Sequence, residues 1–139
     1  IMPGGHQIIG LWANPAYQGQ TAGHCMAGDP VLFSGNILHN ITHFMGMDFV
    51  GLGDVRAQGE VYRVGKPSDR RYIEAVVADG ELRCVNLLDS YHISGVVKNY
   101  LMNRFTGNRA PLPTALRGLL AREGFTDGFL SLFEGEAKA

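Results

Sequence analysis

Three of the five histidines lie between Thr21 and Phe44, in the stretch TAGHCMAGDPVLFSGNILHNITHF. An imidazole has an ordinary pKa of about 6.5, so it can accept or deliver a proton at neutral pH, and it can also bind a metal ion. His24 precedes a Gly-Asp-Pro turn, whereas His39 and His43 are four residues apart. This stretch is therefore the first candidate for acid–base chemistry or for metal binding.

The residues after the Gly-Asp-Pro turn predict the element that would carry His39 and His43. Apolar residues recur at helical spacing from Phe33 to Phe49, and Ser34 is available to cap the start of a helix. We therefore expect a central helix near Phe33–Met47.

Strand and helix patterns occupy separate parts of the remaining chain. The expected segments are a strand at His6–Ala13, a turn-rich stretch from Asn14 to Pro30, strands at 55–64 and 70–88, and helices near Ile93–Phe105 and Thr114–Glu123. An Asp79-Gly80 pair, typical of a tight hairpin turn, divides the longer strand segment into two. The pattern predicts one α+β domain over residues 1–139.

The composition excludes several classes of protein. The chain has 139 residues, an apolar fraction of 45%, a charged fraction of 18% and a net charge of −1. These values are typical of one globular domain, and they give no strong attraction to nucleic acid or to an anionic membrane. No apolar run is long enough for a membrane span and no segment resembles a signal peptide, so we expect a cytoplasmic protein whose two cysteines are reduced thiols.

Two segments resemble a known enzyme family. HCMAGDPVLFSG, followed by the apolar helical pattern, resembles the signature of hotdog-fold β-hydroxyacyl-thioester dehydratases of the 3-hydroxydecanoyl-ACP dehydratase type. VYRVGKPSDRRYIEAVVADGEL is similar to the late strands of that family. The two matches together cover Gly23 to Leu88, and Ser34-Gly35 replaces the Pro-Gly of the family signature.

The resemblance implies a fold, a substrate class and an assembly. The fold would be an antiparallel sheet wrapped on a central helix, hotdog-like, with the helices after residue 90 as a C-terminal extension. The substrate would be a thioester of acyl carrier protein or of CoA, and the chemistry needs no cofactor. Hotdog proteins pair sheet edges across a dimer, so a homodimer is expected.

The resemblance also assigns catalytic roles. Eliminating water from a hydroxyacyl thioester needs a base for the Cα proton and an acid for the leaving hydroxyl. His24 would be the base. The position of the family's acid falls at Asn40, which cannot transfer a proton, and His39 stands beside it. Either His39 takes the acid role, or the protein hydrolyses or binds acyl thioesters instead.

Glycines and arginines would contact the substrate in the same scheme. Gly28 or Gly35 would let the backbone approach the thioester closely, because glycine has no Cβ. Arg70 and Arg71 could bind a phosphopantetheine phosphate or an acidic carrier surface. An arginine pair at the start of a strand is also a common way to protect a sheet edge, and this second interpretation stays open.

Two further hypotheses use the same histidines. On a helix, His39 and His43 could bind one metal ion from a single face, with His24, Asp48 or Cys25 as a third ligand. Alternatively the protein is a non-catalytic module that binds a small ligand or a partner, or that serves in assembly, and its histidines are structural.

Overall fold

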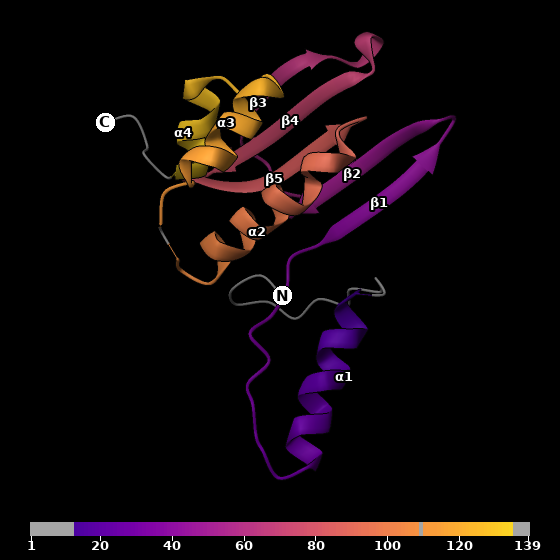
Figure 1. The fold of residues 1–139 in the computed structure, drawn as a ribbon, viewed down its shortest axis with the longest axis vertical. Coiled ribbons are helices and arrows are strands. Elements are labelled where there is room, and N and C mark those ends of the chain that lie inside the picture. The colour runs from indigo at the N-terminus through magenta and orange to yellow at the C-terminus, as the bar shows by residue number, and fades with distance from the viewer. Residues whose placement is uncertain (1–12, 109, 135–139) are drawn as a thin grey trace.

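The computed structural model describes residues 13–108 and 110–134 (Figure 1). Its strands are β1 (His39–Phe44), β2 (Met47–Gly53), β3 (Glu60–Lys66), β4 (Arg71–Ala78) and β5 (Glu81–Leu88). Its α-helices are α1 (Ala13–Met26), α2 (Ser94–Phe105), α3 (Thr114–Arg122) and α4 (Asp127–Glu134). The described residues therefore confirm the α+β class.

The five strands form one antiparallel sheet in the order β1-β2-β5-β4-β3, so β1 and β3 are its edges. Two hairpins close on turns whose central residues both have positive φ, Met45-Gly46 between β1 and β2 and Asp79-Gly80 between β4 and β5. This geometry matches the right-handed twist of paired strands. The Asp79-Gly80 turn is where the sequence predicted it.

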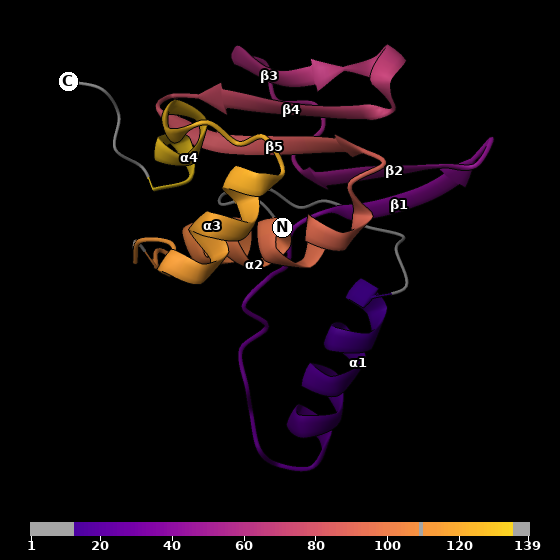
Figure 2. The same cartoon turned by 45° about the horizontal axis from the view of Figure 1, so that its top comes forward.

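The core lies between the sheet and the three C-terminal helices, which cover one of its faces (Figure 2). Alternate strand residues such as Leu52, Ile73 and Val85 point toward these helices and are fully buried. Val97 and Leu101 of α2 pack into the same cluster. The predicted helices near Ile93–Phe105 and Thr114–Glu123 are therefore confirmed.

The predicted central helix at Phe33–Met47 is wrong. Residues 31–38 have no regular secondary structure, and the β1–β2 hairpin follows. Ile41 and Val50 face each other across this hairpin and point toward the helices, whereas Phe49 points to the opposite face and is exposed. The period of the segment is thus two rather than 3.6. The helices that lie on the sheet come from the C-terminal part of the chain, with α2 against β2 and β5.

The prediction of a turn-rich stretch at Asn14–Pro30 is also wrong, because α1 occupies most of it. Pro15 lies in the first turn, where a missing backbone N–H costs little. The helix ends in a Schellman motif: the amide of Asp29 donates to the carbonyl of His24 over 3.0 Å, and Gly28 has a φ of 83°. The strand expected at His6–Ala13 lies outside the described residues, apart from Ala13, which begins α1.

The two cysteines are far apart in the fold. Cys25 is exposed on α1 and Cys84 is buried in β5, and both are free thiols, as the sequence predicts. Burial raises the pKa of the Cys84 thiol to about 11, and the nearby Asp54 and Glu74 carboxylates raise it as well. Cys84 is therefore a protonated residue of the sheet rather than a nucleophile.

Candidate functional site

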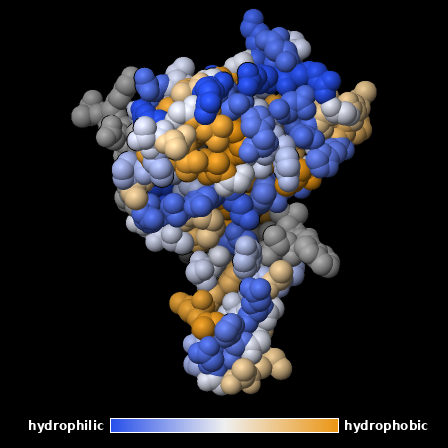
Figure 3. Space-filling view, in the orientation of Figure 1, coloured by the Kyte–Doolittle hydropathy of each residue, from blue (hydrophilic) through white to orange (hydrophobic). Residues whose placement is uncertain are grey.

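Residues 13–35, comprising α1 and the segment after it, form an arm that projects from the sheet and its helices (Figures 1 and 3). From Pro15 to Leu32 every residue is exposed except Thr21, which is half-buried. No arm residue belongs to the hydrophobic core that the described residues form. The arm is thus held to the body of the protein by few contacts.

A cavity of about 400 Å³ lies between the arm and α2. Its lining residues are Tyr17, Gln20, Thr21 and His24 of α1, residues 31–36 of the returning segment, and Lys98 and Met102 of α2. The volume is within the range of about 300–1,000 Å³ that is usual for small-ligand sites. This cavity is the candidate functional site.

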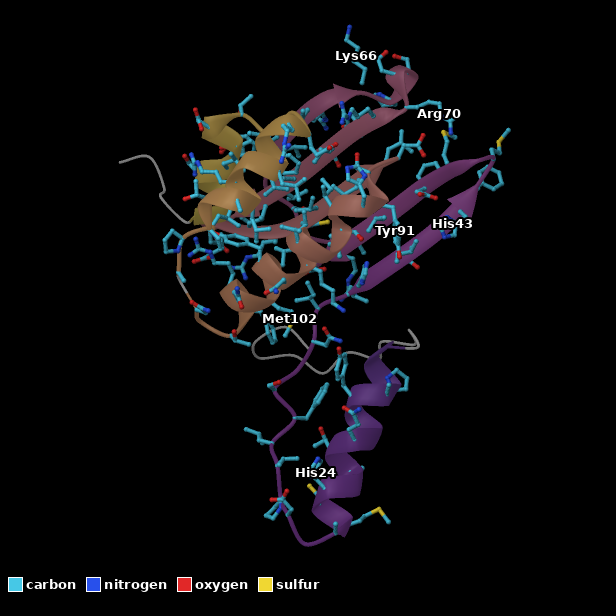
Figure 4. All side chains as sticks on the ribbon, in the orientation of Figure 1. His24, His43, Lys66, Arg70, Tyr91 and Met102 are labelled. Atoms are coloured by element: carbon cyan, nitrogen blue, oxygen red, sulfur yellow. The ribbon has the colours of Figure 1, made fainter. Side chains whose placement is uncertain are left out.

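Helix geometry explains which residues of α1 face the cavity. Tyr17, Gln20, Thr21 and His24 stand at positions i, i+3, i+4 and i+7, and such positions share one face of a helix. In Figure 4, His24 lies between α1 and the returning segment, and Met102 lies where α2 faces the arm. The polar stripe of α1 therefore points inward, toward the body.

His24 is paired with a carboxylate. Its Nδ1 lies 3.0 Å from Oδ2 of Asp29, and the exposed fractions of the two side chains are 58% and 71%. The turn at Gly28 brings Asp29 back beside the helix end. A carboxylate at Nδ1 fixes the orientation of the ring and leaves Nε2 available as a proton acceptor. Gly28 therefore positions the pair and does not itself line the cavity.

The structure brings together only some of the residues that the sequence assigned to one active site. His24 and Gly35 line the same cavity. His39 and Asn40, expected near the base on a helix, instead begin β1 and lie outside the cavity lining, because this segment is a strand. Successive strand residues point to opposite faces, so these two cannot act together. His24, the predicted base, thus has neither His39 nor Asn40 beside it.

His39 is instead a partly buried residue of the sheet. Its Nε2 atom is buried and has no hydrogen-bond partner among the described residues. Burial lowers the pKa of His39, and the positive charge of Lys98 lowers it further. The neutral imidazole is therefore the favoured form, which makes His39 a poor proton donor at neutral pH.

Arg70 and Arg71 lie at the β3–β4 turn and not at the cavity. The guanidinium of Arg70 donates to Oδ2 of Asp89 over 2.9 Å and to the carbonyl of Gly46. The amide of Asp48 donates to Asp89 as well and is the main reason why the pKa of that carboxyl is low. This network joins the β1–β2 turn to the β3–β4 turn.

Arg71 joins the sheet to the end of α3. Its Nη2 donates to Oε2 of Glu123 over 2.6 Å, and Nε2 of His92 lies 3.0 Å from the other carboxylate oxygen. The bond from His92 is the main cause of the low pKa of Glu123, and Arg71 also lowers it. Both arginines therefore have structural partners on the chain itself.

The structure does not support the predicted metal site shared by His39 and His43, because both residues lie in strand β1 and not on a helix. Residues four apart in a strand are about 13 Å apart, too far for one ion. Nδ1 of His43 lies 2.5 Å from Oδ1 of Asp48, and its ring meets the edge of Tyr91 with centroids 6.4 Å apart (Figure 4). Among the described residues, no group of three or more His, Cys, Asp and Glu side chains is placed to hold a metal.

Sequence reasoning missed Lys98 and the arm itself. A signal for the arm was present in the distribution of charge. The chain has 12 Lys and Arg and 13 Asp and Glu residues, and of these only Asp29 comes before Asp48. Lys98 had no comparable signal, because only the fold brings α2 beside residues 31–36.

Comparison with known proteins does not assign a family. No protein-family model matches the chain, and no curated protein is similar to it in sequence. Among the described residues, no helix has the length and apolar character needed to cross a membrane.

Proposed function

We propose that the protein binds a small amphipathic anion, an acyl chain with a negative group at one end, in the cavity beneath the arm. The observation that carries this proposal is the combination of wall residues. Val31, Leu32 and Phe33 offer apolar surface, and Lys98 offers a positive charge. Lys98 is half-buried and forms no ion pair with a described residue. An anion would therefore meet a cation that has no charged partner among the described residues.

The two parts of such a ligand contribute in different ways. Each buried methylene group contributes about 0.8 kcal/mol by leaving water. A hydrogen bond between an ammonium and a carboxylate is charge-assisted and fixes the orientation of the ligand. The chain length thus sets most of the affinity, and Lys98 selects the charged end.

Replacing Lys98 by glutamine is expected to weaken the binding of dodecanoate by about tenfold, since a charge-assisted hydrogen bond contributes about 1.5–3 kcal/mol. Titration calorimetry with the whole chain measures this change. The matched control is Lys66→Gln, because Lys66 lies at the far turn between β3 and β4 (Figure 4) and should leave the affinity unchanged.

Dodecanol tests the two parts of the ligand separately. It has the same chain without the charge, so its affinity should not depend on Lys98. Absence of dodecanoate binding at millimolar concentration, or equal losses in Lys98→Gln and Lys66→Gln, would rule the proposal out.

The pairing of His24 with Asp29 favours a second candidate function, base catalysis on an acyl thioester. Nε2 of His24 would accept a proton, either from Cα of the substrate or from a water that attacks the thioester carbonyl. The open antiparallel sheet with a helix on one face supports a hotdog-like relationship, although the helix is α2. Elimination would still need an acid, which neither His39 nor Asn40 supplies at this cavity.

The second candidate predicts turnover of hydroxyacyl, enoyl or saturated acyl-CoA, followed by enoyl absorbance and by thiol release. His24→Ala should lower the rate by about 100-fold or more, as expected for loss of a general base. His43→Ala is the matched control, because His43 also pairs with a carboxylate but lies outside the cavity. If none of the three proteins shows turnover while all are folded, catalysis is excluded and ligand binding is unaffected.

A further inference from the structure

The outward face of α1 has the opposite character to its inward face. Pro15, Gly19, Ala22 and Met26 lie on the side of the helix away from the cavity, and all are exposed. None of these residues has a polar side chain. A helix that faces solvent normally has polar residues outward and apolar residues inward. Helix α1 has the reverse arrangement, which is expected of a helix whose outward face contacts another protein surface.

Exposed apolar side chains gather in the part of the chain that lacks charge. Beyond Met26, the arm exposes Val31 and Leu32, and 95% of Leu32 is accessible. The β1–β2 hairpin exposes Phe44 and Phe49 on the face opposite the helices. Figure 3 shows apolar side chains on the projecting arm. Depletion of charged residues with exposed aromatic and Met side chains is typical of the centre of a protein interface.

The accessible surface is large for a single folded chain. The protein exposes 8603 Å² at a mass of 15.1 kDa, whereas a folded monomer of this mass exposes roughly 7,100 Å². This total is counted over the whole chain, and the exposed arm is one part of it. A stable interface of standard size removes about 800 Å² from each partner.

Helix α1 also needs contacts beyond those that it makes within itself. Isolated helices shorter than about 12–15 residues are marginal in water even for alanine-rich sequences. Helix α1 has 14 residues, and Gly19 and Gly23 in its interior lower its intrinsic stability further. Contact with another surface would supply the missing stabilisation.

We propose that the protein is a homodimer in which the arm of each copy packs on the outer face of the β1–β2 hairpin of the other copy. The outward face of α1 together with Leu32 would cover Phe44 and Phe49 of the second copy. The assembly uses the outward face of α1, whereas the cavity is lined by its inward face; Leu32 borders both surfaces, because it also lines the cavity.

A second copy is the partner that the surfaces favour. Both the exposed arm and the exposed hairpin belong to this chain, so two copies complement each other in a closed pair with twofold symmetry. Within residues 13–47 the single charged residue is Asp29, which is paired with His24, so the symmetric contact brings no unpaired like charges together. A different protein would leave one of the two surfaces uncovered.

Sedimentation of the whole chain tests the assembly. The wild-type protein should be a dimer at about 10 μM, the concentration at which an interface of standard size with micromolar or tighter affinity is largely formed. Leu32→Glu should be a monomer, because it places a charge in an apolar contact. Val61→Glu is the matched control: Val61 is also exposed but lies in β3, at the edge of the sheet opposite β1, and this variant should stay dimeric. A wild-type monomer at 100 μM, or a dimeric Leu32→Glu variant, would overturn the proposal.

A mixing experiment tests the arrangement itself. Leu32→Glu and Phe49→Lys should each be monomeric alone. A mixture of the two should form dimers, because one arm contact then pairs Glu with Lys and the other is unchanged. Circular dichroism confirms that each variant is folded. Failure of the mixture to form dimers, when the wild type is a dimer, would exclude packing of the arm on the hairpin.

Discussion

Replacing Leu52 by alanine is expected to lower the free energy of unfolding by about 2–5 kcal/mol. Leu52 lies in β2 at the centre of the core and is 0% exposed. The change removes buried methyl groups and leaves a cavity that the paired strands cannot close. Because domains of this size are stable by only about 5–15 kcal/mol, the loss is a large part of the total. Urea unfolding followed by circular dichroism measures it.

The same substitution at Leu32 provides the control. Leu32 is almost fully exposed, so Leu32→Ala should change the free energy of unfolding by no more than about 0.5 kcal/mol. Both variants are compared at a dilute, equal protein concentration, which removes any contribution from association. Similar losses at the two positions would mean that Leu32 is packed in the isolated chain.

Replacing Gly53 by alanine is expected to destabilise the protein by about 3–4 kcal/mol, in two parts. Gly53 has a φ of 83°, and the left-handed conformation costs any residue with a Cβ about 1–2 kcal/mol. In addition, the new Cβ would lie 2.2 Å from the carbonyl oxygen of Arg83. That oxygen accepts a bond of 2.8 Å from the amide of Asp54, so the backbone cannot shift without loss of strand pairing.

Gly28→Ala separates these two parts. Gly28 also has a φ of 83°, but a Cβ there would meet no atom within 4 Å. Its cost should therefore be the conformational part alone, about 1–2 kcal/mol. Thermal or urea unfolding of the two variants gives the difference. Equal costs would show that the contact between Gly53 and Arg83 is relieved by movement of β5.

Local patterns predicted those elements whose own residues decide their structure. The Asp79-Gly80 turn and the alternating residues on each side of it determine β4 and β5. The apolar stripe that includes Val97 and Leu101 determines α2, because that stripe faces the sheet. In these cases, short-range sequence and long-range packing favour the same structure.

The helix predicted at Phe33–Met47 was wrong because the apolar residues there fit both the helical period of 3.6 and the strand period of two. They are spaced so that a helix and a hairpin each bury some of them. The choice is made by pairing of β2 with β5, which lies more than 30 residues further along the chain. The candidate cavity contains predicted residues only where the distance along the chain is short. His24 and Gly35 line it together, whereas Lys98 reaches it through the packing of α2.

The two edges of the sheet differ in how readily they can accept another strand. β3 carries Glu60, Arg63 and Lys66 and is followed directly by Pro67, so a strand added there would bury charges. β1 has no Asp, Glu, Lys, Arg or Pro. Strand addition is therefore disfavoured at one edge and unopposed at the other, and two chains joined through β1 would expose only protected edges. Strand addition can therefore join two sheets once and cannot extend the joined sheet further.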